Sequence, residues 1–129
     1  MKNLLVVLMF SSAFLTGLPA SANSTVDQLL QTYQQQGAQT VDPEQGKKLW
    51  YSKSGDRSCT TCHNSSPDKM GKHARTGKLI KPMASSANPE RFQDSKKVEK
   101  WFLRNCKWTL GRLCTVQEKA NTLSWLNSF

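Results

Sequence analysis

The sequence predicts an all-α domain with long loops at its centre. Apolar side chains recur at helical spacing in four stretches, each preceded by a residue that can cap a helix. No stretch alternates convincingly between apolar and polar residues, as a half-buried strand would. Between residues 52 and 88 the apolar periodicity is lost, and so long a loop is uncommon unless something else organises it.

Two helices are expected in the first part of the domain. Ser24 can cap the first helix, which ends in a polar stretch over residues 34–39. The inward face of this helix is expected to carry Val26, Leu29, Leu30 and Tyr33. Asp42 and Pro43 are typical of the N-cap and first position of a second helix, which continues through Trp50.

Two further helices are expected toward the C-terminus. Asp94 can cap a third helix, and Gly111 is a stop signal for it. Its inward face is expected to carry Val98, Trp101, Phe102 and Asn105. Thr115 and Glu118 form a capping box that opens the last helix, whose apolar positions are Ala120, Leu123, Trp125 and Leu126.

Residues 1–22 have the pattern of a secretory signal peptide. Lys2 is followed by a short apolar stretch and then by Ala20-Ser21-Ala22, so cleavage is expected after Ala22. A retained membrane anchor is the alternative, but the apolar run is short for a bilayer span. We therefore expect a periplasmic protein with one mature domain, residues 23–129, that does not span the membrane.

The chain is strongly basic, with 18 Lys and Arg against 9 Asp and Glu and a net charge of +9. Removal of Lys2 with the signal peptide leaves +8. Nucleic acid is not expected as a partner, because the sequence has no dense basic run or nucleic-acid module and the protein is exported. An acidic redox protein or an anionic membrane surface fits the charge better.

A single C-x-x-C-H motif, formed by Cys59, Cys62 and His63, predicts one covalently attached haem c. The two thiols can each add to a haem vinyl group, and the adjacent histidine can ligate the iron from the proximal side. A thioredoxin-like pair would need a βαβ context, and a zinc site would need further ligands at suitable spacing. Neither is present in the sequence.

A second cysteine pair, Cys106 and Cys114, lies across the connection between the last two predicted helices. In an oxidising compartment a structural disulfide is expected. Two free thiols with a redox role are the alternative.

The ligand on the other side of the iron is open from residue pattern alone. Met83 follows a proline in a loop 20 residues after His63 and could be an axial methionine or a packing residue. Met70 and His73 are further candidates, His73 also as a surface or propionate-contacting residue. Asn88, which precedes a proline, has the pattern of an ordinary helix cap.

Several segments resemble the sphaeroides haem protein family of class I-like monohaem cytochromes c. They are residues 81–92 (KPMASSANPERF), residues 101–106 (WFLRNC), and residues 110–115 and 117–118 (LGRLCT and QE). The resemblance extends from about Val41 to Leu126 and is more specific than C-x-x-C-H alone. It implies a class I cytochrome c-like fold, with helices and long loops around one covalent haem c and one disulfide.

The resemblance also implies particular roles. Asn88 would be the sixth ligand of ferric haem, and the family disulfide maps onto Cys106 and Cys114. An amide oxygen is a hard ligand that suits Fe(III) better than Fe(II), so reduction would release it and admit O₂ or NO. The family further implies a dihaem cytochrome c or a membrane cytochrome b as electron donor.

Three functions follow as hypotheses. The first is an electron-transfer and ligand-binding haem protein rather than a dedicated enzyme. The second is a plain electron shuttle with a methionine sixth ligand, whose basic surface docks an acidic partner. The third is a detached domain whose haem stabilises a larger assembly.

Overall fold

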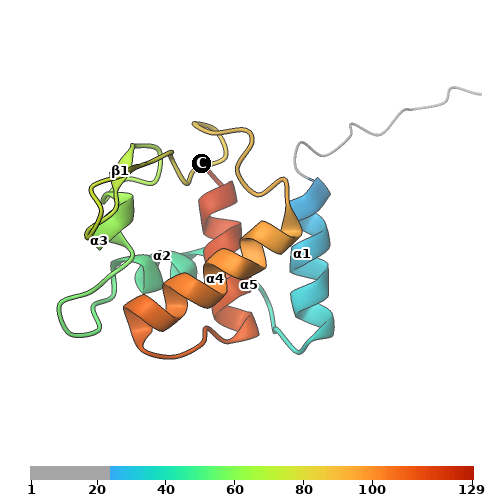
Figure 1. Cartoon of the computed structure of the whole chain (residues 1–129). Coiled ribbons are helices and arrows are strands. Elements are labelled where there is room, and N and C mark those ends of the chain that lie inside the picture. The colour runs from blue at the N-terminus through green and yellow to red at the C-terminus, as the bar shows by residue number, and fades with distance from the viewer. Residues whose placement is uncertain (1–23) are drawn as a thin grey trace, which may run out of the picture.

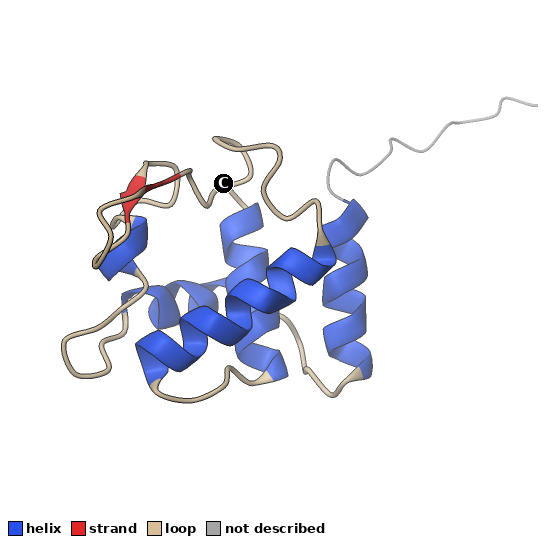
Figure 2. Cartoon of the chain, viewed as in Figure 1, coloured by secondary structure: helices blue, strands red, loops and turns tan. Residues whose placement is uncertain are grey.

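The computed structural model describes residues 24–129, which form five helices and one two-stranded hairpin (Figures 1 and 2). In chain order the elements are α1 (Ser24–Gln35), α2 (Pro43–Tyr51), α3 (Thr60–His63), β1 (Gly71–Lys72), β2 (Leu79–Ile80), α4 (Ser95–Leu110) and α5 (Val116–Asn127). The predicted signal peptide, residues 1–22, lies outside the described residues. No helix within residues 24–129 is long and apolar enough to cross a membrane.

The predicted helix starts are confirmed where their caps are described. The Asp42 side chain accepts hydrogen bonds from two amides of the first turn of α2, and Pro43 is the first residue of that helix. The Asp94 side chain accepts from the Lys97 amide at the start of α4. At the other end of α4, Gly111 adopts the left-handed conformation with φ of 70° that commonly closes a helix.

The last helix, α5, begins with the predicted capping box. Thr115 and Glu118 each accept the other's backbone N–H, which satisfies two amides that the helix leaves unpaired. Most of the following side chains are buried, so α5 occupies the centre of the molecule. Figure 1 shows it in red behind α4, with α1 at one side.

The core lies between α5 and the faces of α1 and α2. Its buried side chains include Val26, Leu29 and Tyr33 of α1, Trp50 of α2, and Leu123, Trp125 and Leu126 of α5. α2 approaches α5 very closely at Gly46, where a Cβ atom would lie 2.2 Å from the carbonyl oxygen of Asn121. Glycine is therefore required for the two backbones to meet at this crossing.

Two predictions about individual elements are wrong. The exposed fraction of Trp101 is 49%, so it does not belong to the buried face of α4; the buried residues of that helix are Val98, Cys106 and Thr109. The expectation of no strand is also wrong, because β1 pairs antiparallel with β2. Strands of two residues are too short to show alternation, which is why the pattern missed them.

Candidate haem site

The short helix α3 carries Cys62 and His63, and Cys59 directly precedes it. The His63 amide donates to the Cys59 carbonyl at 3.1 Å, which closes a single helical turn. Asn64 then takes a positive φ of 68°, outside the helical range, and ends the helix. The backbone of one turn therefore carries both thiols and the imidazole.

The thiols of Cys59 and Cys62 are half-buried and not joined in a disulfide. Burial raises the pKa of Cys59 to about 11, so the thiol is protonated at neutral pH. The sulfur of Cys62 accepts the Ala74 amide at 3.4 Å. Within residues 24–129 no group of three or more His, Cys, Asp and Glu side chains could hold a metal ion, so a zinc site finds no ligand set there.

The imidazole of His63 is mostly buried beside the indole of Trp50. The two ring centroids lie 5.5 Å apart, with the ring planes tilted by 36°. Burial, and then the positive charge of Arg91, lower the pKa of His63 to about 4. The imidazole is therefore neutral at pH 7, which is the protonation state that binds a metal.

The hairpin of β1 and β2 packs directly on α3. A Cβ atom at Gly71 would lie 2.2 Å from the carbonyl oxygen of Cys62 and 2.9 Å from the Cα atom of His63. Only glycine permits this approach, so Gly71 fixes the position of the motif backbone against the hairpin.

His73 and Met70 lie near this hairpin but are exposed. Nδ1 of His73 accepts the amides of Arg75 at 3.3 Å and Thr76 at 3.2 Å, so this side chain stabilises the hairpin turn. Met70 is 46% exposed. Both side chains are exposed, and no hydrogen bond or ring contact among the described residues joins either of them to His63.

Asn88 lies in the loop between β2 and α4 and is buried, with 9% of its surface exposed. Its side-chain Nδ2 donates to the carbonyl of Pro82 at 3.1 Å. Because a carbonyl can only accept, this bond fixes which end of the amide is the nitrogen. Oδ1 makes no hydrogen bond within the described residues, so the interpretation of Asn88 as a helix cap is wrong.

The neighbouring Met83 has different surroundings. It is partly buried and packs against the hydrophobic core. A thioether in such a position fills space, which favours the packing interpretation of this residue.

Backbone hydrogen bonds join the loop that carries Asn88 to the segment that follows His63. The amides of Met83 and Ala84 both donate to the carbonyl of Pro67, at 2.8 and 3.0 Å. Further along, the hydroxyl of Ser85 donates to Oδ1 of Asn127 in α5 at 2.8 Å. The loop is therefore fixed relative to both α3 and the core.

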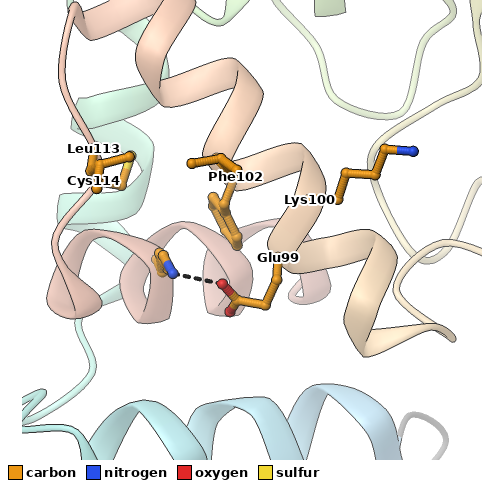
Figure 3. A pocket seen from close by; sticks show the side chains of 7 residues that line it. Glu99, Lys100, Phe102, Leu113 and Cys114 are labelled. Atoms are coloured by element: carbon orange, nitrogen blue, oxygen red, sulfur yellow. Dashed lines mark hydrogen bonds and ion pairs between the residues drawn. The ribbon is translucent and has the colours of Figure 1, made fainter.

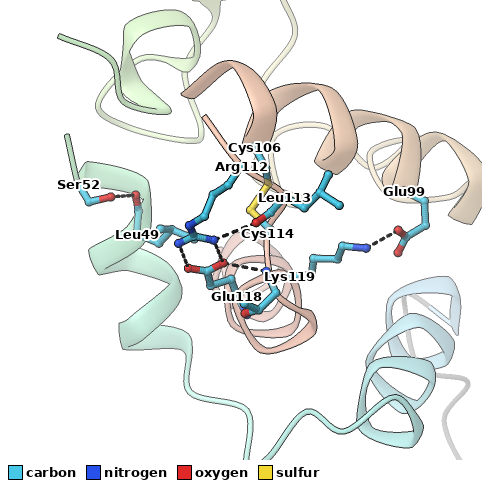
Figure 4. Close-up of a disulfide and its surroundings, with 10 residues drawn as sticks. Leu49, Ser52, Glu99, Cys106, Arg112, Leu113, Cys114, Glu118 and Lys119 are labelled. Atoms are coloured by element: carbon cyan, nitrogen blue, oxygen red, sulfur yellow. Dashed lines mark hydrogen bonds and ion pairs between the residues drawn. A yellow bond between two sulfur atoms is a disulfide. The ribbon is translucent and has the colours of Figure 1, made fainter. Parts of the chain in front are cut away.

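The predicted disulfide is confirmed. Cys106 of α4 is bonded to Cys114, which precedes α5, so the bond joins the two helices at their connection (Figure 4). Beside it, Arg112 donates two hydrogen bonds to the Glu118 carboxylate, at 2.7 and 2.8 Å. The pKa of Glu118 is lowered, first by these hydrogen bonds.

A cavity of about 290 Å³ lies between α4 and the start of α5, next to the disulfide (Figure 3). The Lys119 ammonium donates to the Glu99 carboxylate at 2.7 Å, and the Tyr33 hydroxyl donates to the same carboxylate. Burial raises the pKa of Tyr33. Lys119 and Glu99 of this cavity are therefore paired with each other, and none of the motif residues lines it.

Comparison with known proteins decides the family. Residues 36–126 match the family described as "Domain of unknown function (DUF1924)". The chain is 42% identical over 120 residues to the cytochrome c-type protein SHP of Cereibacter sphaeroides, covering 89% of this chain and 92% of that protein. The chain belongs to the sphaeroides haem protein family.

Solved structures agree with this assignment. A structure described as oxidized SHP, an oxygen binding cytochrome c, matches with a TM-score of 0.76 and 42% identity, covering 83% of this chain and 99% of that one. The solution structure of cytochrome c'' from Methylophilus methylotrophus matches with a TM-score of 0.71 and 30% identity, covering 80% and 92%. The sphaeroides haem protein fold is thus confirmed, and the protein is a monohaem cytochrome c with one covalent haem c.

The residues around α3 fit a haem. Nδ1 of His63 and Nε1 of Trp50 are both buried without a hydrogen-bond partner in the described chain. Buried polar atoms are nearly always paired, so unpaired nitrogens on two neighbouring rings point to a further group at this place. The unbridged thiols of Cys59 and Cys62 supply the nucleophilic sulfurs that covalent attachment requires.

No role was expected from the sequence for two residues that lie near the site. Arg91 acts electrostatically on His63, and the Pro67 carbonyl holds the loop of Asn88. Arg91 lies in a segment that carries the family resemblance, which was the available signal. No side-chain pattern could have identified Pro67, because it acts through its backbone oxygen.

Proposed function

We propose that this protein transfers electrons through a haem whose sixth ligand, Asn88, is released on reduction, so that O₂ or NO can bind. Cys59 and Cys62 form the thioethers, and His63 is the proximal ligand. When bound, the haem supplies one-electron redox chemistry and, after ligand release, an open coordination position. The protein then acts as an electron-transfer and ligand-binding protein rather than a dedicated enzyme.

The orientation of the Asn88 amide carries this proposal. Nδ2 is occupied by the Pro82 carbonyl, which leaves Oδ1 as the end of the side chain available to a metal. A neutral oxygen ligand suits ferric iron and is held less well by softer ferrous iron. The same residue therefore accounts for ligation in one redox state and release in the other.

The fixed loop backbone supports release by the side chain alone. The amide of Asn88 donates to the Ala84 carbonyl at 3.1 Å, and its carbonyl accepts the Arg91 amide at 2.9 Å. These two bonds hold the backbone on both sides of the Cα atom. Rotation of the Asn88 side chain then suffices to open the position, and the ligand can return after oxidation.

The relatives support ligand exchange at this kind of haem. SHP is described as an oxygen binding cytochrome c, and the solution structure of cytochrome c'' is described as giving insight into haem-ligand detachment. Oxygen binding requires an open coordination position at the iron, and detachment of a sixth ligand provides one. The alternative, a plain electron shuttle with Met83 as permanent ligand, is less well supported because Met83 packs against the core.

We also propose that residues 1–22 direct export and that the protein works in the periplasm. The disulfide between Cys106 and Cys114 supports this location, because such bonds persist in oxidising compartments. A mature chain with a net charge of +8 is suited to an acidic electron donor, which we propose to be a dihaem cytochrome c or a membrane cytochrome b.

A matched pair of variants tests the ligand assignment in the haem-loaded protein. Asn88→Ala should leave haem attachment intact and convert the ferric spectrum to that of a high-spin or water-ligated iron. Met83→Leu keeps the side-chain volume and should leave the ferric spectrum unchanged. An unaltered spectrum in Asn88→Ala, or a near-infrared methionine–iron band abolished by Met83→Leu, would overturn the proposal.

A further inference from the structure

The side chain of Arg91 bridges two parts of the loop that carries Asn88. Its Nε donates to the Pro82 carbonyl at 3.0 Å, and its Nη2 donates to the Lys81 carbonyl at 2.7 Å. The planar guanidinium presents these two donors in a fixed fork, which suits consecutive backbone carbonyls. Arg91 therefore links a position near the end of the loop to the loop's first two residues.

The Pro82 carbonyl is shared between Arg91 and Asn88. Nδ2 of Asn88 donates to the same oxygen at 3.1 Å, so both lone pairs of this carbonyl are used. The carbonyl that orients the Asn88 amide is therefore itself held by the guanidinium. Loss of the guanidinium would free the Lys81 and Pro82 carbonyls, and with them the acceptor for Nδ2.

The residue after Arg91 fixes its backbone. Phe92 adopts a left-handed conformation with φ of 68°, which is uncommon for a bulky side chain, and it is 8% exposed in the hydrophobic core. Burial of the phenyl ring offsets the cost of this backbone conformation. The guanidinium of Arg91 thus reaches back across the loop from a position anchored in the core.

The charge of Arg91 has no carboxylate partner within the described residues. Glu90, the adjacent acid, instead approaches Lys81 at 3.7 Å. A half-buried cation is usually paired with an acid, whereas Arg91 is satisfied by neutral carbonyls only. Among the described residues the guanidinium is therefore held by the loop carbonyls and not by an acid.

We infer that Arg91 is the positioning residue for Asn88. It holds the Pro82 carbonyl so that the Asn88 amide keeps Nδ2 bound and Oδ1 free, and it sets how easily Asn88 leaves and returns. The inference rests on the proposed function, because it needs Asn88 as the exchangeable ligand.

Two substitutions in the haem-loaded protein test the positioning role. Arg91→Met removes both hydrogen bonds of the fork, whereas Arg91→Lys keeps the charge without the planar fork. Loss of the charge-assisted hydrogen bond to the Pro82 carbonyl should raise the ratio of high-spin to Asn88-ligated ferric protein about tenfold in Arg91→Met. Arg91→Lys should show most of this change, because an ammonium group does not present two donors in a fixed plane. Arg75→Met, at an exposed hairpin position, is the matched control and should leave this ratio unchanged.

A double substitution shows whether Arg91 acts through Asn88. In Asn88→Ala protein, the further substitution Arg91→Met should leave the ferric spectrum unchanged, because there is no amide left to position. The inference is overturned if Arg91→Met alone keeps the wild-type ferric spectrum, or if it alters the spectrum equally in both backgrounds. Failure of the proposed function is recognised separately, by an unaltered ferric spectrum in Asn88→Ala alone.

Discussion

The helical frame of α1, α2 and α5 is joined by buried side chains such as Val26 and Leu123, both fully inaccessible to solvent. The loop region, residues 52–94, is joined mainly by backbone hydrogen bonds, including those to the Pro67 carbonyl, and has few buried apolar side chains. A frame of this kind derives its stability from the hydrophobic effect. The loop region depends on close backbone contacts, so substitutions in the two regions should fail in different ways.

The largest effect is expected at the crossing of α2 and α5. In Gly46→Ala the new methyl group would overlap the Asn121 carbonyl oxygen, where the contact is 2.2 Å, and neither helix backbone can yield cheaply. We expect a loss of about 3 kcal/mol in the free energy of unfolding, at the upper end for overpacking. Urea denaturation of the haem-loaded protein measures it, with exposed Gln45→Ala as control. A loss below about 0.5 kcal/mol would show that the frame tolerates separation of its helices.

The corresponding substitution in the loop region should lower the free energy of unfolding less but disturb the haem site more. In Gly71→Ala the methyl group would overlap the Cys62 carbonyl oxygen at 2.2 Å and displace the hairpin from α3. We expect a loss of about 1–2 kcal/mol, because loop backbone can move. The visible spectrum should change at the same time, because His63 is displaced. An unchanged spectrum with a large loss of stability would remove the distinction between the two regions.

The smallest effect concerns the capping box of α5. The Arg112 hydrogen bonds hold the pKa of Glu118 below its usual range, so this carboxylate stabilises the fold above the unfolded-state pKa of about 4.3. That contribution is lost as the pH falls through the lower folded-state value. Glu118→Gln should lower the free energy of unfolding by less than about 1 kcal/mol at pH 7. It should also make the free energy of unfolding depend less steeply on pH in the acid range. Exposed Glu44→Gln is the control, and identical acid limbs in wild type and Glu118→Gln would contradict the prediction.

The same difference between the helical frame and the loop region explains which features could be predicted from the sequence. Helix starts at Asp42, Asp94 and Thr115 depend on neighbouring residues, and the structure confirms all three. The disulfide and the haem followed from short motifs. Trp101 was misplaced because the expected inward face of its helix was drawn too wide, and the side chain lies just outside the buried stripe.

The remainder of the site depends on contacts between distant parts of the chain. The Pro67 carbonyl meets amides 16 and 17 residues away, and the Pro82 carbonyl is shared by two side chains further along the loop. Backbone acceptors leave no signature in the side-chain pattern. Asn88 could be selected only by resemblance, because Asn followed by Pro more often indicates a helix cap.

Spectra of the haem-loaded protein in both redox states, with and without NO, show whether Asn88 ligates ferric iron and leaves ferrous iron. We expect a six-coordinate ferric spectrum, a high-spin five-coordinate ferrous spectrum, and rapid binding of NO by the ferrous protein. A low-spin six-coordinate ferrous spectrum that NO does not alter would contradict this expectation.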